Sequence, residues 1–141
     1  MITTVLLVGF LVTAAVLIHY EMLYRLATLL PRKADKHRYH VLVGVLGSLC
    51  AHVIEIWLFA FGYYFMISSG AFGTLQGNFT NTLRDCGYFS FTTYSTLGVG
   101  DIEPVGHVRF LVGLESLTGL VLITWTASFV FVEMQKFWEH K

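Results

Sequence analysis

The sequence predicts an all-α membrane protein with three transmembrane helices and a short helix and loop that enter the membrane without crossing it. Of its 141 residues, 55% are hydrophobic and 13% are charged, whereas soluble domains usually carry about 25% charged residues. The apolar residues are gathered into three blocks, each near the roughly 20 residues that a helix needs to cross a bilayer. The net charge is zero, so there is no basic surface that would indicate a nucleic-acid partner.

Residues 1–30 form the first predicted transmembrane helix. Its apolar run covers 2–18, and Glu21 and Arg25 continue the helix as a favourable ion pair four residues apart. No basic stretch precedes the run and no small-residue cleavage site follows it, so we expect a retained helix and not a signal peptide. Pro31 marks its end. Because Arg25 is its only basic residue, we expect this helix to brace the protein and not to sense voltage.

A short basic loop follows at 31–40 and contains Arg32, Lys33, Lys36 and Arg38. The positive-inside rule places such a loop in the cytoplasm. The N-terminus and the segment between the second and third blocks are then expected outside the cell, with the C-terminus in the cytoplasm.

The second transmembrane helix, over 41–67, carries His52 and Glu55 near its middle. Ionisable side chains at this depth are costly and therefore indicate a function. Because His52 and Glu55 are three residues apart, they lie on one helical face and can hydrogen-bond each other. The alternative is a metal site of a membrane di-metal enzyme, with further ligands drawn from His19, Glu21 or His40. Such a site needs ligands at one depth in the membrane. We expect His19, Glu21 and His40 nearer the cytoplasmic end than His52 and Glu55, and therefore expect no bound metal.

A polar, glycine-rich linker occupies 68–80, and a short helix is predicted over 81–95. Thr82 and Asp85 match a capping box at its start, in which side chains satisfy the first free amide groups of a helix. At 1.5 Å per residue, this helix is too short to cross a bilayer. Its C-terminal end carries a partial negative charge, which favours a nearby cation.

The loop 96–101 reads Thr-Leu-Gly-Val-Gly-Asp. Gly98 and Gly100 can adopt left-handed backbone angles without steric cost, and such angles at alternate residues turn successive carbonyls toward one side. Irregular backbone at membrane depth is tolerated only where it is buried in protein or lines a cavity. The third transmembrane helix covers 107–136. Glu115 lies in its outer part, from where it can reach the short helix as a hydrogen-bonded prop.

These segments resemble a known family. The loop is similar to the selectivity filter of potassium channels, Thr-x-Gly-Tyr/Phe-Gly-Asp. Over 41–133 the chain resembles small bacterial pore-loop ion channels of the potassium-channel superfamily, which are often grouped with the two-pore-domain type. The matching residues are His52-x-x-Glu55 with Trp57, 88–101, Glu115-x-x-x-Gly119 and 124–128.

The resemblance implies a passive cation channel in the bacterial inner membrane, with potassium as the permeant ion, no cofactor and no enzymatic activity. One loop cannot encircle an ion, so we expect a homotetramer around a central pore, in contact with membrane lipids. The implied pore domain, 41–141, consists of an outer helix 41–67, a turret 68–80, a pore helix 81–95, a filter 96–101 and an inner helix 107–136.

The same resemblance assigns roles to single residues. Oxygens that coordinate the ion would come from Thr96, Leu97, Gly98, Val99 and Gly100. Support for the filter would come from Asp101, Glu115 and Tyr94. Gly119 matches the glycine hinge of the inner helix, and close packing against a neighbouring helix is the alternative role.

Val99 departs from the pattern of the family, which has Tyr or Phe at this position. That aromatic ring packs against the pore helix and holds the diameter of the filter, so Val99 predicts a looser filter with relaxed selectivity. Coordination by backbone carbonyls survives the change. The alternative reading is a non-conducting membrane scaffold, or an accessory subunit of another channel, in which this loop has degenerated.

Overall fold

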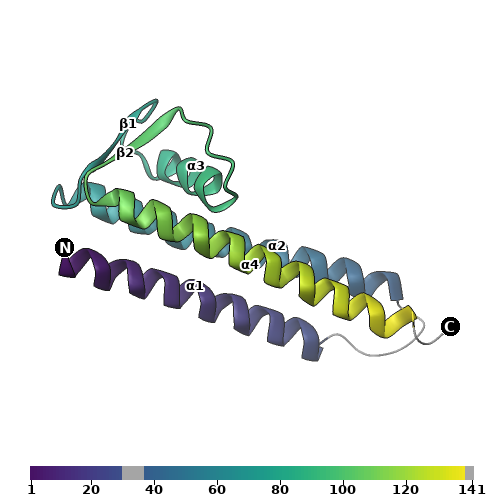
Figure 1. Cartoon of the computed structure of the whole chain (residues 1–141). Coiled ribbons are helices and arrows are strands. Elements are labelled where there is room, and N and C mark those ends of the chain that lie inside the picture. The colour runs from purple at the N-terminus through teal and green to yellow at the C-terminus, as the bar shows by residue number, and fades with distance from the viewer. Residues whose placement is uncertain (30–36, 139–141) are drawn as a thin grey trace.

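Three long helices and one short helix make up most of the protein (Figure 1). The computed structural model describes residues 1–29 and 37–138. The long helices are α1 (Ile2–Leu29), α2 (His37–Ser68) and α4 (Val108–Trp138), and the short helix is α3 (Leu83–Tyr94). Each long helix contains a span that is long and apolar enough to cross a membrane.

The helix ends differ from the predictions by a few residues. Helix α2 begins at His37, within the stretch predicted as a loop over 31–40, and α4 ends at Trp138, two residues beyond the predicted end. Three parts of the predicted elements lie outside the described residues: residue 30 of the first helix, 31–36 of the basic loop and 139–141 of the pore domain.

Helix α1 lies against both α2 and α4. It runs in the same direction as α4, and α2 runs in the opposite direction (Figure 1). Two glycines of α2 permit the close approach of α1. A Cβ atom at Gly47 would come within 2.5 Å of Leu26, and one at Gly62 within 2.6 Å of Leu11.

Much of the apolar surface of the three helices has no protein neighbour in a single chain. Only 17% of the residues in an 18-residue apolar stretch of α4 are buried, and the exposed side chains include Leu117, Leu120, Val121 and Ile123. Lipid tails are as apolar as leucine, so burial alone does not drive helices together in a membrane. These faces are therefore available to lipid or to further subunits.

Helix α3 begins at a side-chain cap, as predicted. The Thr82 Oγ1 atom accepts a hydrogen bond from the Asp85 amide at 3.2 Å. The second half of the predicted capping box differs, because Asp85 Oδ2 accepts from the amide of Thr80 at 2.8 Å, and also from the Thr80 hydroxyl. The hydroxyl of Thr80, followed by its amide, lowers the pKa of Asp85.

The structure is mostly helical, as predicted, and adds a small two-stranded antiparallel sheet that was not predicted. Strand β1 (Thr74–Gly77) lies in the predicted turret and pairs with β2 (Ile102–Val105), which follows the loop 96–101. Gly77 has a φ of 99°, and a Cβ there would lie 2.3 Å from the Asp101 carbonyl oxygen, so glycine is required. The sheet ties the segment before α3 to the segment after the loop.

Candidate functional site

The loop 96–101 leaves the C-terminal end of α3 with left-handed backbone at alternate residues. Thr96, Gly98 and Gly100 have φ angles of 58°, 52° and 82°. The left-handed geometry predicted for the two glycines is confirmed, and the sequence did not indicate that Thr96 would share it. Two amides of the loop bond back to α3, Thr96 N to Thr93 O at 3.0 Å and Gly98 N to Thr92 O at 3.0 Å.

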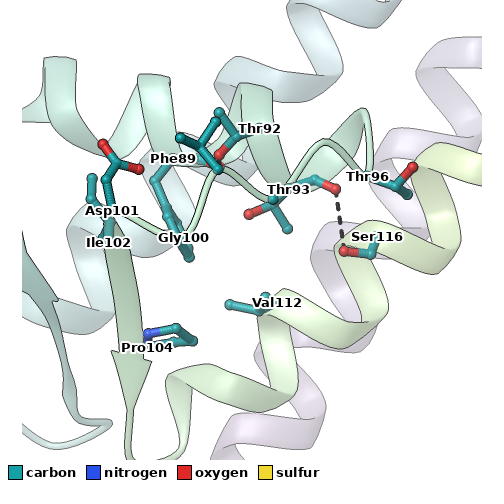
Figure 2. Close-up of a pocket in the computed structure, with 12 residues that line it drawn as sticks. Phe89, Thr92, Thr93, Thr96, Gly100, Asp101, Ile102, Pro104, Val112 and Ser116 are labelled. Carbon is teal, nitrogen blue, oxygen red and sulfur yellow. Dashed lines mark hydrogen bonds between the residues drawn. The ribbon is translucent and has the colours of Figure 1, made fainter.

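One face of this loop is open in a single chain. Leu97 is 70% exposed and Val99 is 55% exposed, and no atom lies within 4 Å of a Cβ built at Gly98 or Gly100. The loop also borders an open pocket whose opposite wall comes from Pro104 of β2 and from Val112 and Ser116 of α4. Figure 2 shows these walls facing each other across the pocket.

Helix α4 packs closely against the end of α3. Ser116 Oγ donates a hydrogen bond to the Thr93 carbonyl at 3.2 Å, the dashed line in Figure 2. Three residues further on, a Cβ at Gly119 would lie 2.1 Å from the Tyr94 carbonyl oxygen. This contact favours close packing over the hinge as the role of Gly119.

Glu115 is fully buried between α2, α3 and α4. Its carboxyl group meets the hydroxyl of Ser90 on α3 and the hydroxyl of Tyr63 on α2. Ser90 Oγ also lies 2.8 Å from the Ile56 carbonyl. The hydrogen-bonded prop predicted for Glu115 is present, and the sequence did not indicate Tyr63 and Ser90 as its partners.

A second buried polar cluster lies under the end of α3. His52 Nδ1 lies 3.2 Å from Glu55 Oε2, which confirms the predicted contact within this pair. Tyr94, the last residue of α3, donates from its hydroxyl to the same Glu55 oxygen, and its Oη lies 2.9 Å from His52 Nδ1. The cluster therefore anchors the residue from which the loop starts.

His19 of α1 also belongs to this cluster, contrary to the expectation that it lies at a different depth. Its Nδ1 atom is 2.9 Å from Glu55 Oε1, and both side chains are fully buried. The expectation was wrong because His19 lies ten residues before the end of α1 at Leu29, and the packing of α1 against α2 brings it to the depth of Glu55. Thr126 of α4 completes the cluster, with Oγ1 2.9 Å from His52 Nε2 and 3.4 Å from His19 Nε2.

Asp101 lies at the other end of the loop, where β2 begins. Its backbone oxygen accepts from the Asn78 amide at 2.9 Å, beside the β1–β2 pair. Desolvation, followed by hydrogen bonding to the Asp101 carboxylate, raises the pKa of Tyr88 on α3. Asp101 thus connects the C-terminal end of the loop to both the sheet and α3.

A family described as "Ion channel" matches residues 51–136, which include the second half of α2 and nearly all of α4. No curated protein matches the chain, and no solved structure matches it.

Proposed function

Because the chain belongs to this ion-channel family, we propose that four copies of it form a passive, potassium-conducting channel around a shared axis. The observation that carries the proposal is the left-handed backbone at Thr96, Gly98 and Gly100 in an exposed loop. Alternation of this kind presents backbone oxygens on one side of the chain, and rings of such oxygens replace the hydration shell of a potassium ion.

The proposed coordinating residues are Thr96, Leu97, Gly98, Val99 and Gly100. One loop supplies only one side of a ring, so conduction requires copies of the loop to meet on an axis. The open face of the loop and the uncovered apolar face of α4 support such an assembly. The C-terminal end of α3, directly before the loop, adds a partial negative charge that favours a cation in the cavity beneath.

We propose that the protein lies in the bacterial inner membrane with its N-terminus outside and its C-terminus in the cytoplasm. The N-terminal ends of α1 and α4 lie at the same end of the molecule as the sheet (Figure 1). The filter loop would then face the outside, and the basic stretch 31–40 would face the cytoplasm.

The filter is proposed to be less selective than one with an aromatic residue at position 99. More than half of the Val99 surface is exposed, so this side chain contributes little packing against α3 within its own subunit. Whether cavity size or carbonyl field governs selectivity, a filter that is held less firmly discriminates less between potassium and sodium.

Flux measurements on purified protein in liposomes test the proposal. We expect a potassium gradient to dissipate through the wild-type protein and not through Gly98→Ala, because alanine in the left-handed region costs about 1–2 kcal/mol per residue in each of four subunits. Gly9→Ala is the matched control, since Gly9 lies within α1 and has nothing within 4 Å of a built Cβ.

Two outcomes contradict the proposal. A stable particle with other than four subunits, measured by cross-linking or native mass spectrometry, excludes the shared four-fold ring. A folded tetramer that passes no ion under any condition favours the non-conducting scaffold or accessory subunit instead.

A further inference from the structure

The cluster of His19, His52 and Glu55 has the composition of a metal site. One candidate ligand atom from each side chain lies within 4.8 Å of the others. His19 and Glu55 are fully buried and His52 is 9% exposed. The three residues come from two different helices, α1 and α2, so the site exists only once these helices have packed.

Two imidazoles and one carboxylate form a ligand set that zinc uses in proteins, with one coordination position left open. Bonds of about 2.0–2.1 Å in a tetrahedral site place ligand atoms roughly 3.4 Å apart. The observed separations are 2.9 Å from His19 Nδ1 to Glu55 Oε1 and 3.2 Å from His52 Nδ1 to Glu55 Oε2. We propose that each subunit binds one zinc-type divalent cation through both Nδ1 atoms and a Glu55 oxygen.

Without a metal, the hydrogen bonds of this cluster depend on where its protons lie. If both histidines were neutral and donated from Nδ1 to Glu55, both Nε2 atoms would be acceptors. Both face the single hydroxyl of Thr126, which has one proton to donate, so one buried Nε2 would lack a donor. A neutral network is complete when Glu55 carries a proton and donates it to His52 Nδ1. His52 then donates from Nε2 to Thr126, and Thr126 donates to His19 Nε2.

Metal binding through both Nδ1 atoms is also compatible with these contacts. Each ring then carries its proton on Nε2 and donates it toward Thr126, whose oxygen can accept two hydrogen bonds. Metal-ligating histidines usually donate their other ring N–H to an oxygen in this way. The Tyr94 hydroxyl, which donates to Glu55 Oε2, orients the carboxylate as a second outer partner.

The position of the site also suits a cation. Tyr94 is the last residue of α3, and the C-terminal end of a helix carries partial negative charge. The Glu55 carboxylate neutralises one of the two charges of the metal. If the protein conducts as proposed above, a bound dication beneath the start of the filter lowers potassium flux; binding of the metal itself does not depend on conduction.

Zinc titration of the purified, chelator-treated protein in detergent tests the site, with a chromophoric chelator as competitor. We expect one tight equivalent per subunit in the wild type and its loss in His19→Gln and in His52→Gln. Thr126→Val removes only an outer partner and is expected to weaken binding by roughly 10- to 100-fold. His107→Gln is the matched control, because His107 is exposed at the start of α4 and distant in sequence from the cluster.

A measurement on the wild type alone guards against variants that fail to fold. Cobalt(II) added to the chelator-treated protein is expected to give the visible absorption of a tetrahedral site, and zinc is expected to displace it. Wild-type protein that takes up neither metal overturns the proposal. It is equally overturned by a well-folded His19→Gln variant that still holds one equivalent of zinc. A protein that binds zinc but passes no potassium would support the metal site and contradict only the proposed channel function.

Discussion

Glu115 offers the sharpest test of the buried packing behind the loop 96–101. Ser90 Oγ has one proton and two neighbouring acceptors, the Ile56 carbonyl and a Glu115 oxygen. If Ser90 donates to Ile56, the Glu115 carboxyl must carry a proton and donate to Ser90, while its other oxygen accepts from Tyr63. Glutamine reproduces this pattern, because its amide donates to Ser90 and its carbonyl accepts from Tyr63.

We therefore expect Glu115→Gln to change the free energy of unfolding by less than about 1 kcal/mol. Glu115→Ala leaves the buried Tyr63 hydroxyl without its partner, at about 1–3 kcal/mol. It also opens a void in a site enclosed by three helices, at about 2 kcal/mol. The total expected loss for alanine is about 3–5 kcal/mol.

Unfolding of the detergent-solubilised protein, followed by tryptophan fluorescence and circular dichroism, measures these changes. Tyr63→Phe supplies a double-mutant cycle: in that background, Glu115→Ala should cost about 1–3 kcal/mol less than in the wild type. Equal losses for Glu115→Gln and Glu115→Ala would refute the protonated carboxyl. Additive effects of the Tyr63 and Glu115 changes would refute the hydrogen bond between them.

Three further predictions concern the loop and its supports. Gly119→Ala places a Cβ 2.1 Å from the Tyr94 oxygen and should lower the thermal midpoint through about 1–3 kcal/mol of overpacking; unchanged stability with altered gating would instead indicate a hinge. The pKa of Asp85 is lower in the folded protein than in the unfolded chain. Its carboxylate therefore stabilises the fold above its pKa in the unfolded chain, and this stabilisation is lost as the pH falls through its pKa in the folded protein. The thermal midpoint should accordingly fall below about pH 4, and less so in Asp85→Asn; equal falls in both proteins would exclude this group. If the loop conducts as proposed, Val99→Tyr should increase the preference for potassium over sodium in reversal-potential measurements. An unchanged preference would argue against the proposed effect of packing at position 99.

The helices could be predicted because their causes are local. Apolar runs of bilayer length give the three spans, and Thr82 three residues before Asp85 gives the start of α3. The sheet could not be predicted in this way. Each strand has only four residues, β1 ends in glycine and β2 contains Pro104, so neither carries the sequence signal of an independent strand. Pairing across the intervening segment is what stabilises them.

The backbone of the loop 96–101 could likewise be predicted only in part. The spacing of Gly98 and Gly100 was sufficient to predict left-handed backbone at those positions, since only the absence of a Cβ makes it free of strain. Thr96 adopts the same left-handed conformation, which is sterically unfavourable for threonine. Hydrogen bonds from the amides of Thr96 and Gly98 to α3 hold it there, and these depend on the tertiary structure.

By itself, the sequence determined the membrane class, the order of the helices and the position of the glycine-containing loop, because each follows from hydrophobicity and backbone sterics within a short stretch. The tertiary structure decided which polar groups meet. It brings His19 to Glu55 across 36 residues and Tyr63 to Glu115 across 52, and it sets Gly119 against the end of α3. These contacts depend on the depth and rotation of whole helices relative to one another, which no local pattern of residues specifies.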